Sequence, residues 1–583
     1  MAKRLRKQRN DSFNIHPLIH IWARTRLDVE DQQKTATKAF LIVSTAVDTD
    51  QIRQDWEFER RVMPHIAAVG GHMKTVAVVG ERILRGGHTL GWVYQVHGQY
   101  DKALEWYERA LAGREKALGV GHPVTLTTVY EMAFLFREQG QYDKALEWYE
   151  RAWAREEKVL GVDHPHTLTT VNSMASLFRE QGQYDKALEW YERALAGREK
   201  ALGVDHPHTL STVHSMVYLF RKQGQYDKAL GWYERAWAQQ EKALGVDHPH
   251  TLTTVNSMAS LFQEQVQYDK ALEWYERALA GREKALGVDH PVTLTTIHQM
   301  ASLFQDQGQY SKALEWYERA LAGREKALGV DHPHTLTSVY WMACLFQKQG
   351  QYDKALKWYE RALAGREKAL GVDHPHTLTS VHLMACLFQE QGQYDKALKW
   401  YEQALAGREK ALGVDHPHTL TTVHQMASLF QDQGLYGKAL AWYQRVLVRG
   451  EKALGVDHPD TLTTIYSMAY LFQEQGQYDK ALKWYERALA GREKALGINH
   501  PSTQRTIHGL VNLYETMGQQ EQAQMLRLKL PLPLPSSPIP MTTVPDVENT
   551  LEEVQISGKV ARPRIEEIPD EENAVSKRRK LGE

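Results

Sequence analysis

Apolar residues recur at helical spacing in two kinds of segment that alternate along most of the chain. In the segment from Pro123 to Phe136, the apolar positions fall on one face of a helix; they are Leu126, Val129, Met132, Ala133 and Phe136. The other kind of segment reads YDKALEWYERALAGREKAL, and a second apolar face runs through it. Each unit is therefore predicted to be a hairpin of two amphipathic helices.

This two-helix unit returns every 42 residues without an insertion. The turn segment GQYDKAL or its equivalent begins at Gly98, Gly140, Gly182, Gly224, Val266, Gly308, Gly350, Gly392, Gly434, Gly476 and Gly518. A histidine followed by proline recurs with the same period, at His122, His164, His206, His248, His290, His332, His374, His416, His458 and His500. Such a period is typical of solenoid proteins, because a lone hairpin cannot bury its apolar faces and neighbours must stack.

Turn chemistry supports these boundaries, and we number positions within a unit from that histidine as 0. The proline at position 1 suits the first turn of a helix, where its missing N–H has no partner. The glycine at position 18 is predicted to end the first helix in a left-handed conformation, and Gly119 is predicted to close the second helix. Val266 replaces the turn glycine in one unit, and a β-branched residue there should strain a left-handed turn.

Small residues at positions 11, 23 and 30 and aromatic residues at positions 14 and 27 form a size pattern that lets helices cross closely. This pattern resembles the tetratricopeptide repeat. The 42-residue form with LGVDHP resembles the repeats of kinesin light chains and of fungal nephrocystin-like proteins. The resemblance covers residues 81–530 and implies an all-α, right-handed superhelical solenoid of about eleven repeats. It also implies a protein-binding scaffold rather than an enzyme.

The repeats are nearly identical except on one stripe of the first helix, at positions 8, 9, 12, 15 and 16. The resemblance implies that this stripe lines the concave groove in which tetratricopeptide proteins hold peptides. We expect it to bind an extended peptide or a partner surface; neutral drift on a solvated face is the alternative. The candidate partner-binding residues are Tyr130, Glu131, Phe134, Asn172, Ser173, His214, Tyr218, Asn256, His298, Gln299, Tyr340, Trp341, His382, His424, Gln425, Tyr466 and Tyr470.

Several residue types on or near this stripe suggest more specific roles. Phe134, Tyr218, Trp341 and Tyr470 are candidate anchors, because aromatic residues dominate interface energetics. Five histidines occupy position 8, and their titration would make ligand binding pH-sensitive. Ten of the 16 tryptophans occupy position 26, where packing on the helix surface is favoured over a role as stacking platforms.

Composition narrows the function classes. The 583 residues carry 71 Lys and Arg against 72 Asp and Glu, whereas nucleic-acid binders usually have a basic excess. No apolar stretch is long enough to cross a bilayer, so no membrane partner is expected. The sequence has no phosphate-binding loop, nucleophile elbow or HExxH motif. We therefore expect no catalytic residue and no cofactor.

Histidine and cysteine were weighed as metal or redox groups. Histidines at positions 0 and 2 have H-x-H spacing, but their recurrence beside proline at a helix start indicates a structural role. A zinc site would need three or four convergent ligands, so no metal is expected. The two cysteines, Cys344 and Cys386, share position 12 of adjacent repeats, too far apart for a disulfide. They are expected to be free thiols on the stripe, in a reducing compartment.

Residues 1–80 differ from the array, with a helix predicted from Pro17 and others at about 31–46 and 52–68. The stretch HPLIHIWAR, His16–Arg24, resembles the segment that closes the winged-helix part of NB-ARC signalling ATPases, the STAND or NLR-like receptors. ERRVMPHI, Glu59–Ile66, is similar to a segment behind it in fungal members that carry such repeats. The resemblance implies the sensor half of a receptor, either truncated or separately encoded, with an NB-ARC-bearing chain as candidate partner. A kinesin-light-chain-like motor–cargo adaptor and a freestanding scaffold are the alternatives.

The repeat pattern stops near Leu530. The segment Pro531–Pro540 is rich in proline and serine, and residues 546–572 are acidic without periodicity, which predicts a disordered tail. Its last residues include the basic cluster Lys577, Arg578, Arg579 and Lys580. This cluster resembles a nuclear import signal, for which an import receptor would be the partner; a solvated charge cluster is the alternative. The expected location is the cytoplasm, with nuclear entry if the cluster is used.

Overall fold

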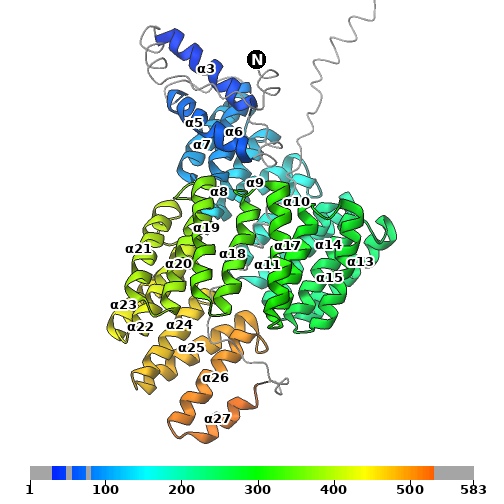
Figure 1. Cartoon of the computed structure of the whole chain (residues 1–583). Coiled ribbons are helices and arrows are strands. Elements are labelled where there is room, and N and C mark those ends of the chain that lie inside the picture. Colours follow the sequence, from blue (N-terminus) through cyan, green and yellow to red (C-terminus); the bar gives the residue numbers. More distant parts are fainter. Residues whose placement is uncertain (1–28, 47–55, 74–80, 531–583) are drawn as a thin grey trace, which may run out of the picture.

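The computed structural model describes residues 29–46, 56–73 and 81–530. That part of the chain contains 24 helices and no strand, which confirms the all-α solenoid (Figure 1). Four of the predictions concern segments outside the described residues. These segments are His16–Arg24, the helix from Pro17, the tail from Pro531 and the basic cluster Lys577–Lys580. No helix among the described ranges has both the length and the apolar character that a bilayer span requires.

Residues 81–530 form eleven consecutive helical hairpins, each made of a helix A and a helix B. The A helices are α6 (Glu81–Val96), α8 (Pro123–Glu138), α10 (Pro165–Glu180), α12 (Pro207–Lys222), α14 (Pro249–Glu264), α16 (Pro291–Asp306), α18 (Pro333–Lys348), α20 (Pro375–Glu390), α22 (Pro417–Asp432), α24 (Pro459–Glu474) and α26 (Pro501–Thr516). The B helices are α7 (Tyr100–Leu118), α9 (Tyr142–Val159), α11 (Tyr184–Leu202), α13 (Tyr226–Leu244), α15 (Tyr268–Leu286), α17 (Tyr310–Leu328), α19 (Tyr352–Leu370), α21 (Tyr394–Ala411), α23 (Tyr436–Ala453), α25 (Tyr478–Leu496) and α27 (Gln520–Arg527).

The recurring histidine starts each A helix from α8 to α26 as its N-terminal cap. In all ten helices its Nδ1 accepts a hydrogen bond from the backbone N–H two residues later, at 3.1 to 3.3 Å. One of the N–H groups that a helix start leaves unpaired is satisfied in this way. The structural role predicted for position 0 is confirmed.

The turn between helix A and helix B has the left-handed backbone that the sequence predicts. The glycine at position 18 has φ between +66° and +74° in every repeat but one. Val266 has φ +61° and is the one residue other than glycine with positive φ in the described ranges. Its backbone N–H still donates to Gln263 O at 2.9 Å, so the turn forms despite the valine.

The core follows the size pattern of the repeat. The alanines at the three small positions are buried, and most of them, including Ala103, Ala110 and Ala133, have no exposed surface. Tyrosine at position 27 is almost fully buried, and in several repeats its hydroxyl reaches position 15 of its own A helix, as in the Tyr359 bond to Gln347 at 2.7 Å. Small residues thus allow close helix crossing, and the tyrosines fill the space between.

Consecutive A helices contact each other directly, as α10 does with α12 and α24 does with α26. This proximity places the A helices on the inner, more tightly curved side of the superhelix. The B helices lie on the outer side. The candidate stripe is therefore on the concave face, as the sequence predicts.

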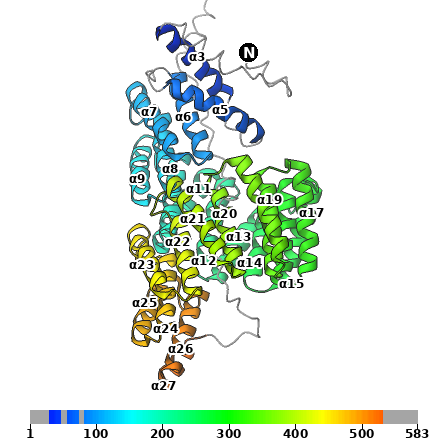
Figure 2. The same cartoon turned by 60° about the vertical axis from the view of Figure 1, so that its left-hand side comes forward.

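The superhelix completes more than one turn, and its second turn packs against its first. The His374 Nε2 atom lies 3.5 Å from Val96 O, and His458 Nε2 lies 3.0 Å from Glu180 O, each across 278 residues or about six and a half repeats. Figure 2 shows α22 and α23, in yellow, directly below α8 and α9, in cyan. Successive turns of the superhelix are thus in direct contact.

Two helices precede the array, α3 (Val29–Ala46) and α5 (Trp56–Met73), close to the predicted ranges. The Phe40 ring stacks on Trp106 of the first hairpin, with centroids 5.6 Å apart. Arg109 Nη2 donates to Met73 O at 2.6 Å. These helices cover the side of the first hairpin that no earlier repeat covers, and the segment Glu59–Ile66 lies within α5.

Candidate interaction surface on the A helices

Position 8 of one A helix and position 9 of the next lie against each other. Tyr130 Oη is 2.9 Å from Ser173 Oγ, and Asn256 Nδ2 donates to Gln299 Oε1 at 2.7 Å. His298 and Trp341 occupy the same pair of positions, with ring centroids 5.7 Å apart. The residues that vary between repeats are therefore joined to one another across the repeats in a single inner stripe, which we define as positions 8, 9 and 12.

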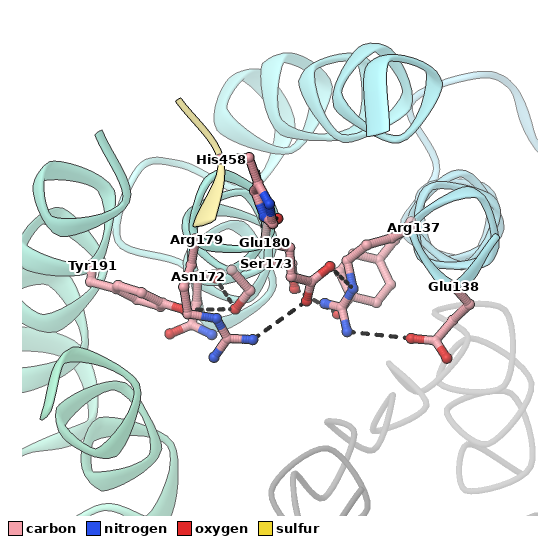
Figure 3. Close-up of polar contacts among 10 residues, drawn as sticks. Arg137, Glu138, Asn172, Ser173, Arg179, Glu180, Tyr191 and His458 are labelled. Atoms are coloured by element: carbon pink, nitrogen blue, oxygen red, sulfur yellow. Dashed lines mark hydrogen bonds and ion pairs between the residues drawn. The ribbon is translucent and has the colours of Figure 1, made fainter. Parts of the chain in front are cut away.

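A second polar ladder runs along the C-terminal ends of the A helices, where position 15 meets position 16 of the next repeat. Arg137 Nε lies 3.5 Å from Glu180 Oε2, and Arg179 Nη2 lies 3.4 Å from Glu180 Oε1 (Figure 3). In later repeats an amide replaces the guanidinium, as in the bond from Gln263 Nε2 to Asp306 Oδ2 at 2.7 Å. This ladder lies beside the stripe. It consists of ion pairs in the first repeats and of hydrogen bonds from neutral amides to carboxylates in later repeats.

Burial divides the candidate residues into those that a partner can touch and those that support them. Tyr470 is the most accessible, with 45% of its surface exposed. The half-buried candidates are Tyr130, Phe134, Asn172, His214, Gln299, Trp341, His424, Gln425 and Tyr466. The buried candidates are Glu131, Ser173, Tyr218, Asn256, His298, Tyr340 and His382. Only the first two groups can contribute direct contacts without rearrangement.

The structure adds a set of buried arginines at position 34, in helix B, which the repeat pattern alone did not mark as special. They are Arg114, Arg198, Arg282, Arg324, Arg366, Arg408 and Arg492. Each is about 3% exposed, and its Nη1 donates to the hydroxyl at position 6 of the next repeat, as Arg324 does to Ser338 Oγ at 2.6 Å. Burial lowers the pKa of Arg324 to about 10. The only sequence signal was the arginine's recurrence within GREKAL.

These arginines also contact the position-8 side chains of the inner stripe from the buried side. Arg198 Nη1 donates to Asn172 Oδ1 at 3.4 Å, and Arg282 Nη1 donates to Asn256 Oδ1 at 3.3 Å. The Arg492 guanidinium lies 5.1 Å from the centre of the Tyr466 ring. Position 8 is thus oriented in these repeats by a cation that donates its hydrogen bonds to neutral oxygens, which fixes the side chain before a partner arrives.

Three repeats replace this arginine, with Glu156, Gln240 and Gly450, and each replacement changes the local charge. Glu156 is 3% exposed, and its Oε2 accepts a hydrogen bond from Thr170 Oγ1 at 2.7 Å. Burial raises the pKa of the Glu156 carboxyl to about 7. Gln240 occupies the equivalent position two repeats later, and no hydrogen bond satisfies either atom of its buried amide.

Three of the five position-8 histidines, His298, His382 and His424, stay neutral across the physiological range. Burial lowers the pKa of His424 to about 4 and holds the pKa values of His298 and His382 well below the usual range of histidine. These three side chains therefore do not titrate between pH 5.5 and 8. Their burial argues against the hypothesis that they make ligand binding pH-sensitive.

Cys344 and Cys386 lie half-buried on the stripe, and neither is in a disulfide, as the sequence predicts. Burial raises the pKa of the Cys386 thiol to about 11. The tryptophans at position 26 pack under arginines of helix B, such as Arg319 at 5.3 Å from the Trp316 ring, which agrees with a packing role. In the described ranges, no three His, Cys, Asp or Glu side chains gather as a metal site would require.

Comparison with known proteins extends over most of the array. The tetratricopeptide repeat model matches nine stretches of the chain, at residues 87–154, 124–200, 166–242, 208–284, 254–326, 292–368, 334–410, 418–494 and 461–526. No curated protein matches the sequence. This repeat is a scaffold type rather than a catalytic one.

Solved structures that resemble parts of the chain are shorter repeat arrays. A putative kinesin light chain with nearly identical TPR-like repeats, from Podosopora anserina, is 31% identical over 35% of this chain and 97% of its own, with a TM-score of 0.31. BtubC (BKLC) from P. vanneervenii is 20% identical over 40% and 96%, with a TM-score of 0.30. A tetratricopeptide repeat protein from Parabacteroides merdae is 18% identical over 50% and 95%, with a TM-score of 0.33. From the nine family matches, the chain belongs to the tetratricopeptide repeat family.

Proposed function

We propose that this protein is a protein-interaction scaffold that binds an extended peptide or a partner surface along the inner stripe of its A helices. The observation that carries the proposal is where the repeats differ. Positions 8, 9 and 12 vary in most repeats, whereas the outer side of helix B is nearly constant apart from position 25, which is Glu, Lys, Gly or Ala. Neutral drift would change both surfaces, but selection for a partner would change only the surface that the partner touches.

The structure of the stripe suits many weak contacts rather than one deep pocket. Aromatic side chains at Phe134, Trp341 and Tyr470 reach the surface, and polar groups at Gln299 and Gln425 lie half-buried between them. Aromatic anchors supply buried area, and amides can bond a partner backbone in either direction. The stripe therefore offers a different contact in each repeat at a fixed spacing.

Affinity purification of the full chain with quantitative mass spectrometry tests this function. The stripe variant carries alanine at Phe134, Gln299, Trp341, Gln425 and Tyr470, and the control carries alanine at five exposed helix B residues, Glu150, Glu192, Glu276, Glu318 and Glu360. We expect partner recovery to fall at least about tenfold in the stripe variant, which corresponds to about 1.4 kcal/mol of binding free energy. Recovery by the control variant should not change. Equal recovery by the two variants would refute the proposal.

For the biological context, we propose the sensor half of an NB-ARC-type signalling receptor. The support is the resemblance of the segments His16–Arg24 and Glu59–Ile66 to the region that joins such repeats to the winged-helix part. An upstream reading frame that encodes a phosphate-binding loop, or co-purification with an NB-ARC-bearing chain, would support it. Co-purification with kinesin heavy chain would instead favour the motor–cargo adaptor, whose repeats resemble these.

For location, we propose the cytoplasm, with import into the nucleus through the basic cluster Lys577, Arg578, Arg579 and Lys580. Four consecutive basic residues fit the acidic groove of an import receptor electrostatically. A fluorescent fusion without these four residues should lose nuclear signal. An unchanged distribution would leave the cluster as a solvated charge group.

A further inference from the structure

The superhelix has two edges along which consecutive hairpins present the same groups. The glycine edge is formed by the turns from helix A to helix B, at position 18. The histidine edge is formed by the leucine at position 38, at the end of helix B, and by the histidine and proline that start the next A helix. Within the chain these edges meet four times, where α20, α22, α24 and α26 begin beside the turns at Gly98, Gly140, Gly182 and Gly224.

The fit between the edges depends on the turn glycine. A Cβ atom at Gly98 would lie 2.8 Å from Pro375 Cδ, and one at Gly140 would lie 3.0 Å from His416 Cδ2. Such distances exclude a larger side chain without movement of the backbone. Around six other turns of the described chain the same added atom would have nothing within 4 Å, namely Gly308, Gly350, Gly392, Gly434, Gly476 and Gly518.

On the histidine edge, three of the four leucines that a glycine edge covers are buried, Leu370 being half-buried, and none of the six uncovered leucines is buried. Leu412, Leu454 and Leu496 are 5 to 6% exposed and pack into the cores of hairpins one superhelical turn earlier. Leu118 and Leu244, at the same position in the first turn, are 39% and 36% exposed. The first turn therefore displays apolar surface that the second turn buries.

We propose that a second copy of this chain docks on these uncovered edges, head to tail. The glycine edge of one copy, from Gly350 to Gly518, would take the histidine edge of the next copy, at the starts of α8 to α16. In a register one repeat earlier, helices α3 and α5 of the second copy would occupy the place of α26 and α27 of the first copy. The second copy would repeat contacts that the chain already makes four times within itself. Because the two edges differ, the contact is heterologous and does not close, so each copy leaves edges for another and a linear assembly forms.

Val266 sets the register of this contact. It follows the four covered turns, it stands where the fit requires glycine, and it is 55% exposed. A histidine edge cannot approach that turn as closely as it approaches Gly98. The start of α8 therefore docks beyond it, at Gly350. This leaves α3, α5 and α6 of the second copy beside Val266 and Gly308, and five glycine turns to meet the starts of α8 to α16.

Light scattering coupled to size-exclusion chromatography tests the proposal on the full chain. We expect the mass to rise above the 66.9 kDa monomer as the concentration rises from about 1 to about 100 μM. The variant Leu118→Glu/Leu244→Glu should stay monomeric, because charge replaces the exposed leucines. The matched control Val120→Glu/Val246→Glu should assemble like the wild type, because the equivalent Val414 and Val456 stay exposed beside covered leucines. A wild type that stays monomeric overturns the proposal.

A second variant acts on the opposite edge and shows whether the contact is head to tail. Gly392→Val/Gly476→Val copies the residue that the chain tolerates at Val266, and it should also stay monomeric. Each blocked variant keeps one intact edge, and these edges are complementary. An equimolar mixture of the two should therefore form heterodimers and nothing larger. Assembly that persists in both variants would overturn the proposal and assign self-association to another part of the chain, such as residues 531–583.

Discussion

The His458 Nε2 atom lies 3.0 Å from the backbone carbonyl oxygen of Glu180, 278 residues earlier in the chain. The same ring caps its own helix through Nδ1, which accepts a hydrogen bond from Asp460 N. One histidine thus serves the local repeat and the contact between superhelical turns. In Figure 3 it comes from a segment one turn away from the residues around Glu180.

The contact between turns should weaken in acid. Burial, with a smaller contribution from Arg408, lowers the pKa of His416 to about 3, and burial holds the pKa of His374 well below its usual range. A lowered pKa means that the contact is fully stable above about pH 6.5 and loses stability as the pH falls towards the folded value. At pH 5 the loss should be up to about 2 kcal/mol for each histidine.

Small-angle scattering measures this opening. The radius of gyration should increase between about pH 7.5 and about pH 5 in the wild type. The double variant His374→Asn/His416→Asn should not expand, because asparagine still caps a helix but takes up no proton. Equal expansion of both proteins would contradict this origin of the pH dependence.

Glu156 should give the opposite pH dependence. Its pKa is raised to about 7, so it stabilises the fold fully below its unfolded value of about 4.5 and loses that stability as the pH rises through 7. Glu156→Gln should therefore raise the free energy of unfolding at pH 8 by about 2 to 3 kcal/mol and change it little at pH 4.5. The exposed Glu150→Gln is the control in urea unfolding. If Glu156→Gln is no more stable than the wild type at pH 8, the Glu156 carboxyl is not buried with a raised pKa.

The buried arginines at position 34 should matter more than the surface arginines. Arg282→Ala removes donors to Thr296 Oγ1 and Val292 O from a site that is 3% exposed. We expect a cost of about 2 to 4 kcal/mol, because buried acceptors lose their partner. Arg277→Ala breaks the exposed pair with Glu241 and the contacts with the Trp237 and Trp274 rings, and should cost about 1 kcal/mol. Denaturant unfolding of the two variants measures both losses of stability. Equal losses would be inconsistent with a special role of the buried arginines.

Val266→Gly should stabilise the protein, as the sequence alone already predicts. The left-handed φ of +61° strains a valine and suits glycine, with a gain of about 1 kcal/mol or more. Gly308→Val, the reverse change one repeat later, should cost a similar amount. A melting temperature that is unchanged or lower in Val266→Gly would contradict the strain.

Local features of this fold could be predicted from the sequence, whereas features that accumulate along the array could not. Pro123, Gly119 and the histidine at position 0 act on their own helix ends, so their roles follow from a single repeat. The contact between His458 and Glu180 depends on a small rotation between repeats, summed over a full turn. No motif encodes that sum.

The same distinction applies to the candidate site. Variation at positions 8, 9 and 12 identified the inner stripe, but it could not show that Tyr340 and His382 are buried by their neighbours. It also missed Arg198 and its equivalents, because an arginine in the polar stretch GREK, next to a glutamate, has the sequence pattern of a solvated face. Their burial follows from the next repeat, whose hydroxyl and carbonyl groups receive them.

The central claim is that partners bind the inner stripe, and blocking one thiol tests it most directly. Ser302→Cys places a thiol at position 12, where the chain itself carries cysteine in two other repeats, and Glu318→Cys places one on the exposed side of α17. Each is built in the Cys344→Ser/Cys386→Ser background and coupled to a maleimide-linked polymer, and partner capture is measured before and after coupling. We predict that coupling at position 302 lowers capture at least about tenfold while coupling at position 318 leaves it unchanged. Capture that survives coupling at 302, or is lost equally at both positions, would contradict the claim.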